Sequence, residues 1–210
     1  MFTIYGYGTF NPMKVVATAE ELGLEYKFVT VDLGSGENLK PEHLARHPLG
    51  KVPVLDHDGH IVFESAAICR YLANVNGKRL YSDDPKQASR IDQVMDTMSI
   101  HIGRWLSVYF WEEVICPMFY NRPADAKAIA EAHMWLTKQL PYVDKVLSEN
   151  EFLCGSEISI ADTFAFASFQ IKDTTSVDLT PYPNILRWYD AMKARPAIKK
   201  ADKVVFFNQK

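Results

Sequence analysis

The sequence predicts a two-part fold, a small α/β unit followed by an all-helical bundle. Three observations predict it: strand and helix periods alternate over the first eighty residues, strand signals largely vanish from Pro85 onward, and polar residues with a proline cluster around Arg79–Lys86. We therefore expect a first domain over residues 1–80, a linker over 81–86 and a helical domain over 87–210.

The first elements of the α/β unit are a strand, a helix and a second strand. The strand Phe2–Gly6 is rich in β-forming residues. Asn11 is the expected N-cap of the helix, with Pro12 at the first helical position, and Gly23 closes that helix. The segment Tyr26–Asp32 is the second strand.

The unit continues with a connector, a hairpin and a further helix. The connector holds a short helix over Pro41–Arg46. Strands at Val52–Leu55 and His60–Phe63 flank the turn Asp56–Gly59, whose Asp-Gly step is a strong hairpin signal. The helix Ser65–Asn74 follows. A βαβ unit that is followed by a hairpin predicts a mixed sheet.

The second part is expected to contain four helices, which span Gln87–Ile115, Ala124–Glu149, Thr163–Lys172 and Tyr182–Ala194. Pro117 and Pro123 interrupt the first pattern, and Pro141 must kink or divide the second. Ser159 and Asp162 form a capping box in front of the third helix. The fourth ends before a proline.

Composition excludes several classes of protein. The 210 residues are 48% hydrophobic and 23% charged, which is the range of a globular chain, and the net charge of −3 argues against a general nucleic-acid binder. No apolar run approaches the roughly 18–20 residues that span a bilayer, and the start lacks the basic and apolar regions of a signal peptide. We expect a cytoplasmic protein with no membrane and no nucleic acid among its partners.

The three cysteines, Cys69, Cys116 and Cys154, are an odd number, are widely spaced and include no Cys-x-x-Cys. This pattern excludes a disulfide framework and predicts no metal site. We interpret all three as structural.

Three motifs in register carry a family resemblance. Gly50-Lys-Val-Pro-Val-Leu55, the stretch Phe63–Leu72 that begins Phe-Glu-Ser-Ala-Ala, and Ser159-Ile-Ala-Asp-Thr163 resemble those of cytosolic glutathione transferases over nearly the whole chain. The resemblance implies a thioredoxin-like N-terminal domain that binds glutathione, then an all-α domain. Elongation-factor subunits and bacterial stress proteins share this architecture.

The resemblance also implies a glutathione site. It gives Val52 the role of pairing its backbone with the cysteinyl part of glutathione, and it makes Pro53 a cis-proline. Ser65 would hold the γ-glutamyl carboxylate at a helix N-terminus, where unpaired N–H groups suit an anion, and Glu64 would hold the γ-glutamyl amine. Lys40 and Lys51 are the candidates for the glycyl carboxylate.

The thiol-activating residue is left open among three candidates. Family members place Tyr, Ser or Cys just after the first strand, where this chain offers Tyr7, Thr9 and Asn11. Counting back from Lys14-Val15, which resembles the family's Arg-Val, aligns Thr9 with the serine of the serine-type classes. Asn11 is an alternative donor to the sulfur or a helix cap, and Tyr7 is the tyrosine-type alternative. This Thr/Asn loop resembles bacterial and fungal members that reduce disulfides.

Aromatic residues gather in the helical part. The resemblance implies that Trp105, Tyr109 and Phe110 line an electrophile pocket, because an apolar substrate needs an apolar wall. Packing in the core or between subunits must account for most of these rings.

The leading hypothesis is a homodimeric glutathione transferase that serves detoxification. It uses glutathione as cosubstrate and activates its thiol for attack on a small hydrophobic electrophile or a peroxide, as a transferase of alkyl or aryl groups. A glutathione-dependent disulfide reductase and a non-catalytic binding module in a protein complex remain the alternatives.

Overall fold

The computed structural model describes residues 1–207, which form two units. The first comprises Met1–Ser82 and the described residues 194–207, and the second comprises Asp83–Lys193. The expected division placed everything after residue 86 in the helical part. The contacts instead group the end of the chain with the α/β unit.

The first unit contains the expected mixed sheet, with strand order β2-β1-β3-β4. Its strands are β1 (Phe2–Gly6), β2 (Tyr26–Thr30), β3 (Val54–His57) and β4 (His60–Phe63). β1 runs parallel to β2 and antiparallel to β3, which runs antiparallel to β4. The predicted bounds of the third strand, Val52–Leu55, were wrong by two residues at each end. β3 begins later because Pro53 has no N–H to offer a ladder, and it continues to His57 because Asp56 and His57 pair with both β1 and β4.

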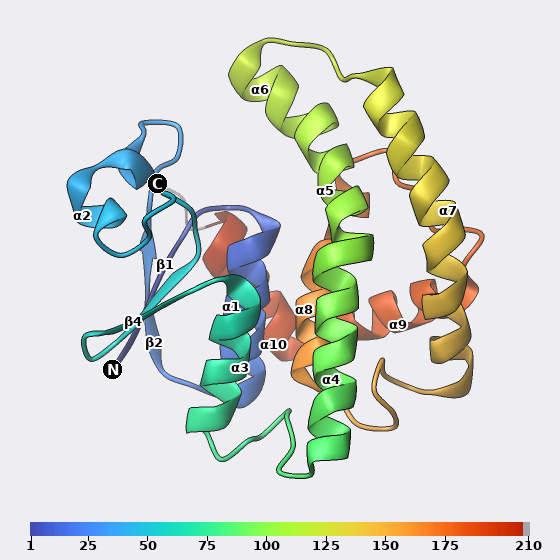
Figure 1. Cartoon of the computed structure of the whole chain (residues 1–210), viewed down its shortest axis with the longest axis horizontal. Helices are drawn as coiled ribbons and strands as arrows, with labels where there is room; N and C mark the ends of the chain where they lie inside the picture. The colour runs from blue at the N-terminus through green and yellow to red at the C-terminus, as the bar shows by residue number, and fades with distance from the viewer. Residues whose placement is uncertain (208–210) are drawn as a thin grey trace. The chain divides into compact units, whose positions relative to one another are not determined.

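The helices of this unit are α1 (Phe10–Leu22), α2 (Pro41–Leu44), α3 (Ser65–Val75) and α10 (Pro196–Asp202), with a 3₁₀ turn at Glu37–Leu39 and a π-helical turn at Lys203–Phe207. Helices α1 and α3 cover one face of the sheet, and α2 lies on the other side (Figure 1). α10 packs along α1, and most of α1 is buried as a result. Helix α10 was not predicted from the sequence, and Pro196 takes its first helical position.

The start of α1 differs from the prediction. Its N-cap is Thr9, so Asn11 and Pro12 both lie inside the first turn. Asn11 therefore does not cap the helix. The other end agrees with the prediction, because Gly23 ends α1 in the left-handed conformation, with φ of 69°.

The helical unit begins with a long helical path built from α4 (Pro85–Thr97), η2 (Met98–Ile102), α5 (Gly103–Phe110), η3 (Trp111–Ile115) and α6 (Cys116–Tyr120). The segments η2 and η3 are π-helical turns. The expected interruption at Pro117 was wrong, since the helix continues to Tyr120 and ends at Asn121. The wider turn of η3, which ends two residues before Pro117, relieves the crowding that a proline ring causes in an α-helix.

The remaining helices are α7 (Ala126–Glu149), α8 (Ile160–Phe169) and α9 (Pro183–Ala194). Asp125 caps α7, and Pro141 lies inside α7 without dividing it. The predicted capping box is confirmed: Asp162 accepts from the Ser159 backbone N–H, and the Ser159 hydroxyl accepts from Ala161. Asp162 also accepts from Trp188 at 3.0 Å. No helix within residues 1–207 combines the length and hydropathy needed to cross a membrane.

Candidate functional site

Three segments that carry predicted site residues leave the sheet at the same end. Tyr5 of β1 pairs with Val54 of β3, and Val54 pairs with Phe63 of β4. Because β3 runs antiparallel to both neighbours, the end of β1, the start of β3 and the end of β4 lie together. The register therefore gathers the β1–α1 loop, the segment before β3 and the start of α3 at one edge of the sheet.

Thr9 lies at the N-terminus of α1 with an extended backbone, and its side chain makes no capping hydrogen bond. Its N–H donates to the Tyr7 carbonyl at 2.6 Å and closes a tight turn. The residue is half-buried. Its hydroxyl is therefore not used in capping, at a helix end where N–H groups and the macrodipole favour an anion. A thiolate bound here could accept a hydrogen bond from Thr9.

Asn11 is held by a buried lysine one turn further along α1. The Lys14 ammonium donates to Asn11 Oδ1 at 3.0 Å, and the residue Lys14 is only 5% exposed. An ammonium can only donate, so the carbonyl end of the amide faces Lys14 and the NH₂ group faces away from it. Burial lowers the pKa of Lys14 to about 8, while Cys69 and the Glu64 carboxylate oppose that shift.

The two tyrosines of this loop differ in their surroundings. The Arg46 guanidinium lies 4.3 Å from the ring centroid of Tyr5, so that ring faces a cation. Tyr7 is half-buried, and its carbonyl accepts from Thr9. Thr9, Asn11 and Tyr7 all lie at the start of α1, and the choice among them stays a prediction.

Val52 has an unpaired backbone next to a cis peptide bond. The Val52–Pro53 bond is cis, as the resemblance implied. No backbone hydrogen bond among residues 1–207 uses the Val52 N–H or C=O. The two preceding carbonyls are occupied, since Asn38 donates to Gly50 O and His43 Nε2 lies at hydrogen-bond distance from Lys51 O, both at 2.8 Å. Val52 can therefore pair with an extended peptide.

Glu64 is the N-cap of α3 in a conformation that side chains rarely adopt. Its φ is 70° and its ψ is 115°, and its side chain makes no capping hydrogen bond. Such a backbone costs on the order of 1–3 kcal/mol and persists where the surrounding fold imposes it, often at binding sites. Ser65, the first residue of α3, is half-buried at the end of an uncapped helix, where a carboxylate can bind.

The two predicted lysines lie on the surface of the same unit. Lys51 is exposed and directly precedes Val52. Lys40 is exposed, and its ammonium lies 3.6 Å from the Glu37 carboxylate. A surface ion pair of this kind contributes little to stability, so Lys40 can exchange Glu37 for an anionic ligand. Lys51 is exposed and can interact with the same kind of ligand.

The predicted electrophile-pocket residues of the helical unit lie in different surroundings. Trp105 stacks on Trp135 of α7, with ring centroids 5.8 Å apart and planes 9° apart. Tyr109 is 4% exposed, and burial raises its pKa together with the Glu113 carboxylate. Phe110 is half-buried. Trp105 therefore packs against α7 while Tyr109 belongs to the core.

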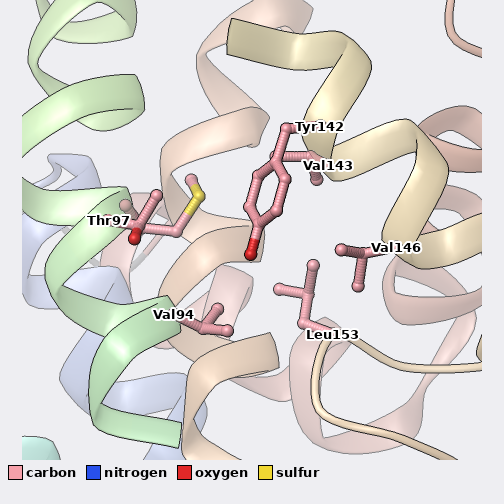
Figure 2. A pocket seen from close by; sticks show the side chains of 7 residues that line it. Val94, Thr97, Tyr142, Val143, Val146 and Leu153 are labelled. Carbon is pink, nitrogen blue, oxygen red and sulfur yellow. The ribbon is translucent and has the colours of Figure 1, made fainter. Parts of the chain in front are cut away.

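A cavity in the helical unit lies elsewhere, between α4, α7 and the following loop. Figure 2 shows Tyr142 pointing from α7 toward Val94 of α4, with Val146 and Leu153 beside it. The cavity volume is about 20 Å³, which is room for a single water molecule. None of the three predicted pocket aromatics lines it. We assign it to packing.

All three cysteines are buried. Burial raises the pKa of Cys69 to about 11 and that of Cys154 to about 11. Cys116 Sγ accepts from Arg122 at 2.7 Å. A buried thiol with a raised pKa is a poor nucleophile, which agrees with the structural role expected from the sequence.

Sequence reasoning missed the residues that hold the segment before β3, namely Asn38, His43 and His47. Both histidines are buried. Their spacing of four residues places them on adjacent turns, which is the one signal that could have revealed them.

Comparison with known proteins gives consistent matches over both units. Residues 1–74 match the family model described as the glutathione S-transferase N-terminal domain, and residues 111–201 match that of the C-terminal domain. A probable glutathione S-transferase of rice, GSTF2, is 32% identical over 195 residues, which are 91% of each chain. Glutathione S-transferase hmp2 of Hypomyces subiculosus is 32% identical over 208 residues, 94% of this chain and 96% of that protein.

Solved structures agree with these matches. Poplar glutathione transferase F1 superposes with a TM-score of 0.90 at 28% identity over 99% of both chains. A glutathione S-transferase-I structure bound with lactoylglutathione gives 0.89 at 26% identity, covering 97% of this chain and 99% of that one. The curated relatives named above come from a plant and a fungus. The likeness of the Thr/Asn loop to bacterial and fungal members that reduce disulfides stays a prediction.

Proposed function

Because the chain belongs to the glutathione S-transferase family, we propose that it binds glutathione on its α/β unit and activates the thiol as a transferase. The substrate would be a small hydrophobic electrophile or an organic peroxide. The observation that carries this proposal is the gathering of three segments at one edge of the sheet: the start of α1, the unpaired Val52 and the start of α3.

Glutathione is an extended anionic tripeptide, and each part of it has a suitable partner at this edge. The Val52 backbone would pair with the cysteinyl residue as an added strand. Ser65 and the N–H groups at the start of α3 would bind the γ-glutamyl carboxylate, and Glu64 the γ-glutamyl amine. Lys51 and Lys40 would interact with the glycyl carboxylate.

The chemistry requires a thiolate. A cysteine-type thiol has a pKa of about 8.5, so only a few per cent is ionised at neutral pH. A Thr9 hydroxyl bond and the α1 N-terminus would stabilise the thiolate selectively. Asn11 supports this arrangement, because its NH₂ group faces away from Lys14. The thiolate sulfur would then form a bond to the electrophilic carbon while the leaving group, such as the halide of an aryl halide, departs with its electron pair. The buried cysteines of this chain would take no part.

The test is glutathione binding by calorimetry, followed by conjugation to an activated aryl halide such as 1-chloro-2,4-dinitrobenzene. Ser65→Ala should weaken binding by about 1–3 kcal/mol, because it removes a hydrogen bond to a carboxylate. Ser148→Ala, at an exposed position in the helical unit, is the matched control and should leave affinity unchanged. Wild-type protein that neither binds glutathione nor catalyses conjugation would support the non-catalytic alternative.

Three finer properties belong to the same proposal. The electrophile would contact Trp105 and Phe110, while Tyr109, which is only 4% exposed, would support these rings from the core. The protein would act in detoxification in the cytoplasm. It would also work as a homodimer, an assignment that the exposed apolar residues of the helical unit support, such as Met118 and Tyr120. Light scattering at micromolar concentration that gives the monomer mass would overturn the dimer.

A further inference from the structure

Two buried histidines support the segment that carries the glutathione-binding residues. His43 belongs to α2 and is 3% exposed, and His47 follows one turn later at 2%. Burying an imidazole costs free energy unless its ring nitrogens find hydrogen-bonding partners. The partners of these two rings lie in the segments that carry the proposed glutathione-binding residues.

His43 interacts with the backbone immediately before Val52. Its Nε2 lies 2.8 Å from the Lys51 carbonyl oxygen. A carbonyl can only accept, so Nε2 carries the hydrogen and donates it. The other ring nitrogen, Nδ1, is buried and has no partner within residues 1–207. The Lys51 carbonyl is therefore the hydrogen-bonding partner of this ring in the described structure.

His47 reaches the second glutathione-binding segment. Its Nδ1 accepts from the Leu49 N–H at 3.2 Å. Its ring packs on Phe63, with centroids 4.7 Å apart. Phe63 directly precedes Glu64, the residue with the strained backbone at the start of α3. One imidazole thus contacts both the turn before Lys51 and the corner at the end of β4.

We propose that His43 and His47 are positioning residues of the glutathione site. His43 fixes the Lys51 carbonyl and so orients the free N–H and C=O of Val52 toward the tripeptide. His47 sets the distance between that segment and the Phe63–Glu64 corner. The inference rests on the proposed function, because it assigns these residues an effect on glutathione binding.

Asn38 makes the same kind of contact one residue earlier. Its side-chain amide donates to the Gly50 carbonyl at 2.8 Å. With the Gly50 and Lys51 carbonyls both held by side chains, the segment has one orientation when it reaches Val52. A ligand that pairs with a backbone already in place loses less conformational entropy on binding.

The experiment compares His43→Leu with His43→Gln. Leucine removes the donor, whereas the glutamine amide can place an N–H near the former Nε2 position. We expect His43→Leu to raise the dissociation constant of glutathione roughly 3- to 10-fold, the range of one lost hydrogen bond. The kcat at saturating glutathione should stay within about 2-fold. His43→Gln should restore most of the affinity, and His133→Leu, at an exposed histidine, is the control.

The outcomes separate this inference from the proposed function. If wild-type protein binds glutathione and folded His43→Leu binds it equally well, the positioning role is wrong. If wild-type protein does not bind glutathione, the proposed function fails and this inference fails with it. If His43→Leu does not fold, nuclear magnetic resonance of the wild-type imidazoles decides: glutathione should shift the His43 and His47 ring signals, and unshifted signals would overturn the proposal.

Discussion

A single hydroxyl carries the thiol activation in the proposed mechanism. If Thr9 donates to the bound thiolate, Thr9→Val removes a charge-assisted hydrogen bond worth about 1.5–3 kcal/mol. The pKa of the bound thiol should then rise by about 1–2 units, since one unit corresponds to 1.36 kcal/mol. Ultraviolet absorbance of the thiolate, titrated against pH, measures the shift. Glutathione affinity at low pH, where the thiol is protonated in both proteins, should barely change.

The same titration separates the three candidates. Thr9→Ser keeps a hydroxyl and should keep the pKa low. A large shift in Tyr7→Phe with none in Thr9→Val would show that the alignment of this loop is wrong. A shift confined to Asn11→Ala would make the amide held by Lys14 the principal donor.

Glu64 combines strain with a proposed ligand contact, and two substitutions separate these effects. Glu64→Gly should raise the free energy of unfolding by about 1 kcal/mol, because glycine tolerates a positive φ. The extra conformational freedom of glycine in the unfolded chain offsets part of the relieved strain. The same variant should bind glutathione less tightly, since it lacks the carboxylate. Urea denaturation and calorimetry measure the two effects.

Glu64→Gln is the matched control for that experiment. It keeps the strained backbone and removes the charge, so affinity should fall while stability stays near wild type. A Glu64→Gly protein less stable than wild type would contradict the strain argument.

At the scale of elements, α1 contains the buried Lys14, whose effect on the free energy of unfolding depends on pH. Burial lowers the pKa of Lys14 from 10.5 to about 8. Below pH 8 the Lys14 ammonium is charged in the native and in the unfolded state, and burying that charge in the native state costs about 3 kcal/mol. Between pH 8 and 10.5 the native state has released its proton while the unfolded chain retains it, so this contribution to stability rises with pH. Lys14→Met should lack that rise.

Urea denaturation from pH 7 to 10 tests this sign. The stability of wild type relative to Lys14→Met should increase with pH across that range. Lys14→Arg keeps its charge throughout and should not gain stability in the same window. A difference between wild type and Lys14→Met that is independent of pH would show that Lys14 is not desolvated.

The π-helical turn η2 depends on the glycine that follows it. A Cβ at Gly103 would lie 2.4 Å from the Met98 carbonyl oxygen, a backbone atom that cannot move without opening the turn. Gly103→Ala should therefore lower the free energy of unfolding by about 1–3 kcal/mol despite the better helix propensity of alanine. Thermal denaturation of wild type and Gly103→Ala measures this loss of stability. Stability equal to or above wild type would mean that η2 converts to a regular α-helix.

Local signals explain which elements the sequence could predict. The glycine that ends α1, the Asp58-Gly59 step of the hairpin before β4 and the capping box of α8 are determined by neighbouring residues, and in these three features the structure agrees with the prediction. The continuous helix through Pro117 was not predictable in this way, because the π-helical turn that accommodates it is not encoded in apolar periodicity. The support of Val52 by His43 was missed for a similar reason, since it joins residues brought together by tertiary folding.

At the scale of the whole molecule, the chain leaves the α/β unit at Ser82 and returns to it at Ala194. The last predicted helix ends before Pro196, and α10 was not predicted because a seven-residue helix offers too few turns for a periodic pattern. In the structure, Glu21 of α1 accepts from Arg195, and Glu20 forms an ion pair with Lys200 at 2.8 Å. The α/β unit thus includes Arg195 and α10, which the chain supplies after the helical unit.

This connectivity predicts that α10 contributes to the stability of the unit that binds glutathione. Ile198 is fully buried in α10, and Ile198→Ala should lower the free energy of unfolding by about 2–5 kcal/mol through lost burial and a cavity. Saturating glutathione should recover part of that loss, because a ligand that binds the native unit stabilises it by mass action. Ile100→Ala, at a residue that is 62% exposed, should change stability by less than about 0.5 kcal/mol. Equal thermal midpoints for Ile198→Ala and Ile100→Ala would show that the α/β unit folds without its C-terminal helix.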